Sequence, residues 1–300
     1  MTTGNHAKLL WPGINAIFGK EYTEYPVEYT KLFDMFTSRQ NYEEDLQVTG
    51  LGLPSVKPEG SAITYDTSRQ GFVTRYTHVV YANGFIVTEE AVDDDLYDVV
   101  GAKGARQLAF GMRQGHEIVG ANVYNRAFTS TYAGGDGKEL LATDHPNING
   151  GTWSNEPTNA VDLSEAALEQ ACIDIMGFTD DRGLKISVIP QTLIVPKELV
   201  FEAERILKTP YRIGTADNDI NALYAMGKFP GGIVVNHYLT DADAWFIRTN
   251  IKDGMKHFQR KPLRFAIDND FDTENAKFKA QERYSVGWTD ARGLYGSPGV

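Results

Sequence analysis

Apolar residues between Thr88 and Phe128 recur at helical spacing, and this stretch contains no proline. Thr88 is a typical N-cap residue, and acidic residues follow it in the first turns, where they favour the positive end of a helix dipole. The pattern predicts one helix of about forty residues, which at about 1.5 Å per residue would be roughly 60 Å long. That length exceeds the diameter of a compact domain of this size, so we expect the helix to act as a strut.

Glycine recurs along one side of this helix. Gly101, Gly104, Gly111 and Gly115 follow one another, with Leu108, at steps of three and four residues. Each glycine inside a helix costs about 1 kcal/mol relative to alanine. We therefore expect another segment or subunit to lie against the stripe and to require the space. The alternative is that the stretch divides into two or three helices at the glycine pairs.

Residues 51–87 combine β-branched and aromatic side chains with turn signals at Pro54 and Pro58. The strand-forming residues include Ile63, Tyr65 and Phe72, and polar residues alternate with them in the middle of the stretch. A ribbon with polar residues on both sides is poorly buried by its own domain. The pattern predicts a projecting β-hairpin that finds its partner on a neighbour.

Residues 1–50 are aromatic and show no clean period. Leu32, Phe33 and Phe36 indicate one short helix. We expect this segment to be an arm that lies on another surface, and the alternative is an ordinary N-terminal element packed on its own domain.

The rest of the chain mixes helices and strands, which indicates an α+β protein. Pro190 places its strand at a sheet edge or interrupts it. The expected elements are a loop at Tyr132–Trp153, helices at Asp162–Met176 and Lys197–Leu207, and strands at Val188–Val195, Gly232–Asn236, Ala244–Thr249, Leu263–Ile267 and Phe278–Trp288.

The chain of 300 residues has a net charge of −11, from 40 acidic and 29 basic residues. Nothing in the sequence resembles a basic patch, so we do not expect a sequence-specific nucleic-acid binder. Neither a signal peptide nor a membrane span is visible. The single cysteine, Cys172, excludes an intramolecular disulfide and fits a reducing compartment.

The search for reactive groups predicts no catalytic, cofactor or metal site. His116-Glu117 would need a second histidine at Gly120 to form a zinc-binding helix motif. The run from Asp268 to Glu274 lacks the glycine and the final glutamate of a calcium loop, so we interpret it as a solvated turn. Asp144-His145 has no nucleophile placed beside it, and we interpret it as loop structure.

Five segments, in order, carry a resemblance to a known family. They are ELLATDHPNINGGTWSN from Glu139, DLSEAALEQACIDIMGFTDDRGLKI from Asp162, PQTLIVPKELVFEAERIL from Pro190, YLTDADAWFI from Tyr238 and ERYSVGWTDARGLYG from Glu282. The chain resembles the major capsid proteins of tailed bacteriophages with the Hong Kong 97-type fold, and within them the Mu-type major head subunits.

The resemblance implies a layout for the chain. It consists of an N-terminal arm at 1–50, an extended β-hairpin loop at 51–87, a peripheral domain at 88–185 and 262–300 that includes the spine helix 88–128, and an axial domain at 186–261. The resemblance also implies a structural protein, without enzymatic activity or cofactors. It would assemble through pentamers and hexamers of identical subunits into an icosahedral shell around double-stranded DNA.

Further partners follow from the same resemblance. They are a scaffolding protein, a portal, decoration proteins and packaged DNA contacted non-specifically, with no membrane and with assembly in the host bacterial cytoplasm. Because the chain begins with Met and the arm follows at once, we expect the scaffold to be a separate protein. We expect no crosslink, since Lys57 and a partner asparagine match no motif.

The residues expected at subunit interfaces lie in the arm, the hairpin, the spine and the axial domain. They are Tyr22, Tyr25, Tyr29, Phe33, Val56, Lys57, Ile63, Tyr65, Phe72, Arg75, Gly104, Gly111, Gly115, Asn218 and Tyr224. Two alternatives stay open: an encapsulin-like compartment that encloses protein cargo, and a hydrolase or metal enzyme that uses Asp144, His145 and the acidic run.

Overall fold

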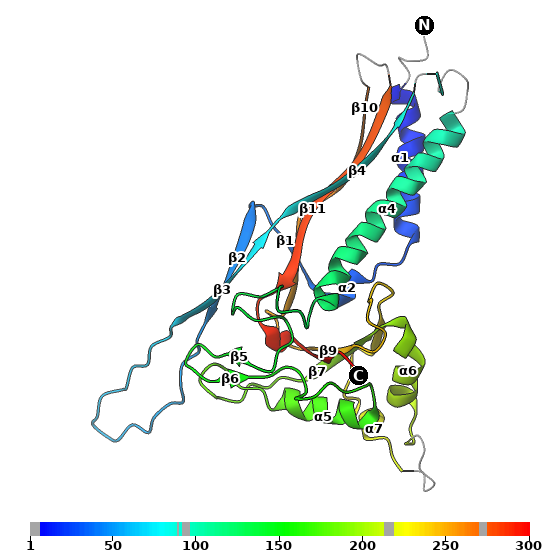
Figure 1. The fold of residues 1–300 in the computed structure, drawn as a ribbon. Helices are drawn as coiled ribbons and strands as arrows, with labels where there is room; N and C mark the ends of the chain where they lie inside the picture. The colour runs from blue at the N-terminus through cyan, green and yellow to red at the C-terminus, as the bar shows by residue number, and fades with distance from the viewer. Residues whose placement is uncertain (1–6, 89, 92–96, 213–218, 270–274) are drawn as a thin grey trace.

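The computed structural model describes residues 7–88, 90–91, 97–212, 219–269 and 275–300 (Figure 1). Its helices are α1 (Ala7–Glu24), α2 (Tyr29–Leu32), α4 (Tyr97–Asn125), α5 (Glu165–Met176), α6 (Val200–Lys208) and α7 (Ala222–Met226), with 3-10 turns at Lys197–Leu199 and Ala291–Gly293. Its strands are β1 (Asp34–Thr37), β2 (Tyr42–Val48), β3 (Gln70–Thr77), β4 (Val79–Val87), β5 (His145–Pro146), β6 (Thr152–Trp153), β7 (Pro190–Val195), β8 (Ile233–Val235), β9 (Trp245–Thr249), β10 (Met255–Asn269), β11 (Ala276–Trp288) and β12 (Leu294–Ser297).

The strut is confirmed as one unbroken helix over α4, whose 29 residues span about 43 Å. The alternative of a break at the glycine pairs is wrong, because all four glycines lie inside α4. Thr88 accepts a hydrogen bond at 3.4 Å from the backbone N–H of Ala91, as an N-cap residue does. Residues 92–96 lie outside the described part. The helix ends at Asn125, three residues earlier than predicted, and turns follow it.

One face of a four-stranded sheet, in the order β1-β10-β11-β4, is covered by α1 and α4, which lie side by side (Figure 1). Ile14 and Phe18 of α1 are buried there with Leu108 and Met112 of α4. The ring of Phe18 stacks on that of Phe265 in β10, with 4.4 Å between the centroids. A core of apolar and aromatic side chains therefore joins the N-terminal helix to the sheet.

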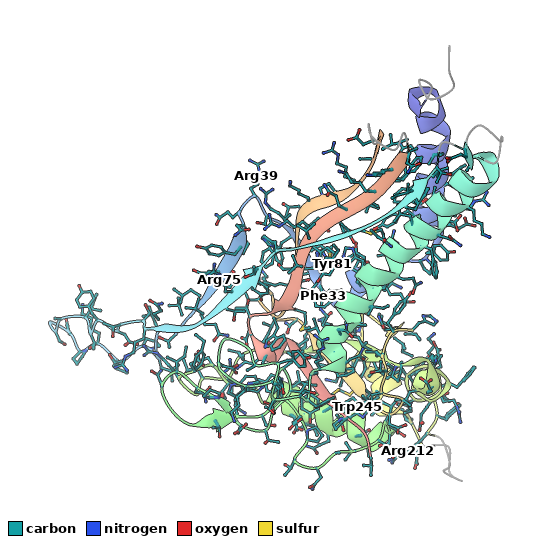
Figure 2. All side chains as sticks on the ribbon, turned by 45° about the horizontal axis from the view of Figure 1, so that its top comes forward. Phe33, Arg39, Arg75, Tyr81, Arg212 and Trp245 are labelled. Atoms are coloured by element: carbon teal, nitrogen blue, oxygen red, sulfur yellow. The ribbon has the colours of Figure 1, made fainter. Side chains whose placement is uncertain are left out.

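This packing corrects the expectation for residues 1–50. They include an 18-residue helix that the sequence analysis did not predict, and that helix lies on its own chain. The predicted helix at Leu32–Phe36 is also wrong, because α2 ends at Leu32 and β1 pairs in parallel with β10. Phe33 is 2% exposed and packs edge-on against Tyr124 of α4 (Figure 2). The ordinary N-terminal element, which was the alternative, describes this segment better.

The hairpin formed by β2 and β3 leaves the body of the molecule, as Figure 1 shows. It begins at Tyr42, nine residues before the predicted boundary, because Glu43 and its acidic neighbours form a strand. Residues 51–69 have no regular strand, so the predicted strand at Ile63 and Tyr65 is wrong. The end of the predicted hairpin is β4, which pairs with β11 in the main sheet.

The second sheet, in the order β12-β9-β7-β8, lies between α5 and α6 on one side and the C-terminal end of α4 on the other. Leu193 and Val195 of β7 face the helices, and Ile194 faces Tyr124. Burial on both faces explains the continuous apolar run of β7. Pro190 does not place this strand at an edge, since it occupies the first position of an interior strand.

Three elements show that the predicted domain boundaries do not follow the sheets. Helix α5, assigned to the peripheral domain, shares a core with β7 and β9. Strand β12, assigned to the same domain, pairs with β9 in the second sheet. Strand β10 begins at Met255, inside the range expected for the axial domain.

Candidate assembly surfaces

The hairpin tip, residues 49–69, presents apolar side chains to solvent. Val56 is 94% exposed, Tyr65 is 89% exposed and Leu53 is 78% exposed. Ile63 and Lys57 are exposed as well. A projecting segment with apolar side chains and few contacts to its own chain is typical of an interaction site.

A polar clasp joins the base of this tip to the turn after α5. One carboxylate oxygen of Asp66 accepts hydrogen bonds from the backbone of Gly52 at 2.7 Å and from Nη1 of Arg182 at 2.6 Å. Nη2 of Arg182 also donates to the carbonyl of Thr67 at 2.5 Å. The backbone N–H donors from Gly52 and Thr67, with the guanidinium beside them, lower the pKa of the Asp66 carboxyl. The clasp fixes where the tip leaves the body.

The two strands of the hairpin carry further predicted interface residues. Arg75 of β3 lies over the ring of Tyr42 at 3.8 Å and reaches Glu44 at 3.8 Å (Figure 2). Its side chain remains 55% exposed, whereas Phe72 is half-buried. Arg75 is therefore accessible to a neighbour, and Phe72 is only partly so.

The predicted arm residues contact their own chain. Tyr22 packs under the guanidinium of Arg113 at 3.9 Å, and Tyr25 meets Phe110 edge-on at 5.1 Å. Tyr29 stacks on His116 with 4.0 Å between centroids. With Phe33 buried as described above, the structure contradicts the idea that these rings await another surface.

The glycines of α4 have unlike surroundings. A Cβ on Gly104 would lie 2.7 Å from the ring of Phe85 on β4, so the space there is filled by the same chain. A Cβ on Gly111 would meet only Asn83 at 3.9 Å, and one on Gly115 would meet nothing within 4 Å. The predicted close packing is thus internal at Gly104, while Gly111 and Gly115 leave an open face of the spine.

The candidate catalytic pair does not form. His145 is fully buried, and its ring nitrogens contact Asp136 Oδ2 at 2.7 Å and Asn155 Oδ1 at 3.1 Å. Asp144 instead accepts a hydrogen bond from Lys138 at 2.5 Å. Burial raises the pKa of the Cys172 thiol to about 11, which leaves the thiol protonated. Asp144 and His145 belong to loop structure, as predicted, and Cys172 is a buried core residue.

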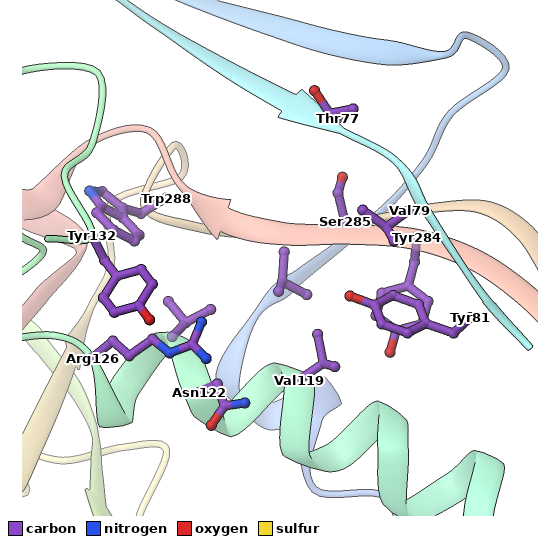
Figure 3. A pocket seen from close by; sticks show the side chains of 12 residues that line it. Thr77, Val79, Tyr81, Val119, Asn122, Arg126, Tyr132, Tyr284, Ser285 and Trp288 are labelled. Carbon is purple, nitrogen blue, oxygen red and sulfur yellow. The ribbon is translucent and has the colours of Figure 1, made fainter.

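A groove with about 370 Å³ of space lies between α4 and strands β4 and β11 (Figure 3). Arg126 of α4 lies over the ring of Tyr132 at 4.4 Å at one end, and Tyr81 and Tyr284 line the other. Among the residues that line this groove, Arg126 is the only charged one. The groove therefore offers no acid–base pair of the kind that hydrolysis needs. In the described ranges no three His, Cys, Asp or Glu side chains are placed to hold a metal ion.

The model of the family described as "Phage capsid protein" matches residues 72–297. The chain belongs to this phage capsid protein family. Membership identifies a structural role in a virus capsid and does not favour an enzyme. No curated protein sequence matches the chain.

Solved structures share the Hong Kong 97-type α+β fold of this capsid protein. A phage-related protein from Bordetella bronchiseptica RB50 is 13% identical with a TM-score of 0.51, covering 94% of this chain and 95% of that one. The capsid protein of the native GTA particle is 13% identical with a TM-score of 0.51, covering 91% and 90%. That of the empty GTA particle is 12% identical with a TM-score of 0.51, covering 90% and 88%. At these identities the likeness concerns the fold alone.

The sequence analysis placed interface residues in the axial domain, and the structure exposes an apolar surface there, around α7. Four of its apolar side chains are about half exposed or more: Tyr211, Ile220, Tyr224 and Met226. Asn218, also predicted there, lies outside the described residues.

A surface that the sequence analysis missed is the sheet face turned away from α4. Alternation along β11 buries Phe278, Ala280, Glu282 and Tyr284 and points the intervening side chains outward. The register with β10 then gathers five cations on one face, with Asp268 opposite one of them: Lys261, Arg264, Lys277, Lys279 and Arg283. The statement that no basic patch exists is corrected, since strand pairing creates one in an acidic chain.

Within the described part, no helix is long and apolar enough to cross a bilayer.

Proposed function

We propose that this protein is the major head subunit of a tailed phage, which self-assembles through pentamers and hexamers into an icosahedral shell around double-stranded DNA. Its place would be the virion, after assembly in the cytoplasm of a host bacterium. The hairpin tip carries the proposal, because its exposed apolar side chains are not buried by their own chain. Contacts that repeat between identical copies and close by rotation produce rings and shells.

The proposed contact surfaces are the hairpin with its tip, the open spine face and the surface around α7. The hairpin includes Arg75, and the tip includes Val56, Lys57, Ile63 and Tyr65. The spine contributes Gly111 and Gly115. The division into peripheral and axial domains, the Mu-type subfamily and non-specific contact with DNA remain predictions, as do scaffolding, portal and decoration partners.

Deletion of the tip is the decisive experiment. Gly52 and Asp66 are already hydrogen-bonded at 2.7 Å, so residues 53–65 can be replaced by a short Gly-Ser link without moving the strands. We expect a folded, soluble chain that forms no shells by electron microscopy and sedimentation, whereas the full chain forms them. The matched control is Glu59→Ala, which alters the same tip but keeps its apolar side chains.

Normal shells from the tip deletion would contradict the role of the tip. A full chain that stays monomeric at high micromolar concentration would contradict self-assembly itself. The encapsulin-like alternative differs in its contents, so DNA recovered from nuclease-treated particles supports the head subunit, and a protein cargo without DNA would overturn it.

A further inference from the structure

Three ionisable side chains from three elements meet in the interior between α4 and the main sheet. His116 of α4, His257 of β10 and Glu282 of β11 are at most 2% exposed. Nδ1 of His116 lies 3.1 Å from Oε2 of Glu282, and its Nε2 lies 2.9 Å from Nε2 of His257. We call these three residues the histidine cluster.

Aromatic rings enclose the cluster. The imidazole of His116 is stacked between Tyr29 of α2 and Tyr284 of β11, each 4.0 Å away between centroids. Tyr81 of β4 stacks on the far side of Tyr284 at 4.6 Å. The rings exclude water, so a charge that arises in the cluster must be compensated by the protein.

The other ionisable groups that face the cluster are already engaged. Arg113 of α4 donates twice to the carbonyl of Tyr22 of α1. Glu117 of α4 accepts from the backbone of Glu28 and Tyr29, at 3.1 and 2.9 Å. Burial raises the pKa values of Tyr22, Tyr29, Tyr81 and Tyr284, so these phenols stay neutral. None of these groups is therefore free to compensate a second positive charge on the histidine cluster.

The histidine cluster can accept one additional proton but not two. The contact between the two Nε2 atoms requires a single proton between them, and the carboxylate of Glu282 requires a proton on Nδ1 of His116. One additional proton makes His116 an imidazolium, which Glu282 compensates. A second additional proton would place hydrogens on both Nε2 atoms and set two cations side by side.

The other ring nitrogen of His257, Nδ1, has no acceptor among the described residues for an added proton. Nδ1 of His257 is buried without a hydrogen-bond partner in the described part of the chain, as are Oε1 of Glu282 and the hydroxyl of Tyr284. Burial, and then the neighbouring His116, lower the pKa of His257 to about 3. Protonation of both histidines therefore requires them to separate.

We propose that the histidine cluster is a pH-sensitive latch between the spine helix and the sheet, closed near neutral pH and released in acid. Release loosens α2 as well, because Tyr29 stacks on His116 and Glu117 holds the backbone at the start of α2. The N-terminal segment 7–32 and α4 thus form the part of the subunit that responds. The latch is a property of the chain and does not depend on the proposed shell.

The sign of the effect follows from linkage. In the open form His257 regains its ordinary pKa of about 6.5, above its value in the closed form. The histidine therefore stabilises the closed form fully above about pH 6.5. Each pH unit below that shifts the ratio of closed to open forms by about tenfold, down to about pH 3.

Amide hydrogen exchange of the full chain between pH 7.5 and 4.5 tests the latch, after correction for the intrinsic rate. We expect protection in α4 and residues 7–32 to fall with pH by up to tenfold per unit in the wild type, and to stay constant in His257→Gln, which does not titrate. His78→Gln is the matched control, since His78 is also buried but bridges Ser38 and Ser285 away from α4. This control should keep the wild-type slope.

A flat wild-type profile, or an unchanged slope in His257→Gln, would overturn the latch. Histidine Cε1–H exchange measured by mass spectrometry on the wild type decides the matter if the variant fails to fold. His257 should then titrate below about pH 5, and a midpoint near 6.5 would refute the proposal.

Discussion

Nη1 of Arg182 and Oδ2 of Asp66 lie 2.6 Å apart although 116 residues separate them in the chain. This contact joins the projecting hairpin to the body of the subunit. The position of the tip in space thus depends on a turn that belongs to another part of the fold.

Loss of this contact should free the tip without unfolding the protein. Arg182→Ala removes the bonds to Asp66 and Thr67, and because solvent screens this exposed pair we expect little change in the midpoint of global unfolding. Tryptic cleavage after Arg69, at the base of the tip, should become several-fold faster. Lys197→Ala, which removes the exposed pair with Glu198, is the control, and equal cleavage rates in both variants would contradict the clasp.

Two glycine substitutions on the spine should have different effects. Gly104→Leu forces a side chain against Phe85 and should destabilise the subunit by about 1–3 kcal/mol in thermal or urea unfolding. Gly111→Leu meets open space, so the subunit should be as stable as the wild type or slightly more stable.

The yield of shells should reveal an effect of Gly111→Leu that the stability of the isolated subunit does not. If the open spine face is covered by another subunit, Gly111→Leu lowers the yield of shells although its subunit is stable. Unchanged shell yield and thermal stability of the particles in this variant would show that no neighbour packs closely at Gly111.

His145 should matter for stability. His145→Ala removes a fully buried ring and with it the contacts to Asp136 Oδ2 and Asn155 Oδ1, of which the latter still accepts from the backbone of Ala142. We expect about 2–4 kcal/mol of destabilisation. Asp144→Asn, which alters only an exposed pair, should leave the midpoint of unfolding nearly unchanged. A stable His145→Ala that loses a hydrolytic activity would revive the enzyme hypothesis.

The surface around α7 should be needed for assembly. Tyr224→Asp and Met226→Asp place charges on two exposed positions, so the fold measured by circular dichroism should be unchanged while shells are lost. Glu202→Ala, on the first turn of neighbouring α6, is a control that should assemble normally. Shells of normal yield from both aspartate variants would exclude this surface as an interface.

Elements whose signals are local could be predicted from the sequence. The spine, α5 and strands β8 and β9 follow from periodicity, helix caps and β-branched runs. For each element these signals lie within a short stretch of sequence. The projecting hairpin was also predictable, because polar residues alternate along its strand β3, although the tip has no strand of the kind predicted at Ile63 and Tyr65. The order of the segments that resemble phage head subunits supplied the family.

The sequence by itself therefore determined the family, the spine and the protruding hairpin. Only the tertiary structure decided that α1 packs on its own chain, that β7 is an interior strand, and that Asp66 meets Arg182. It also brought His116, His257 and Glu282 together from α4, β10 and β11. The physical reason is that strand register and helix packing set these distances, and both depend on partners far away in the chain.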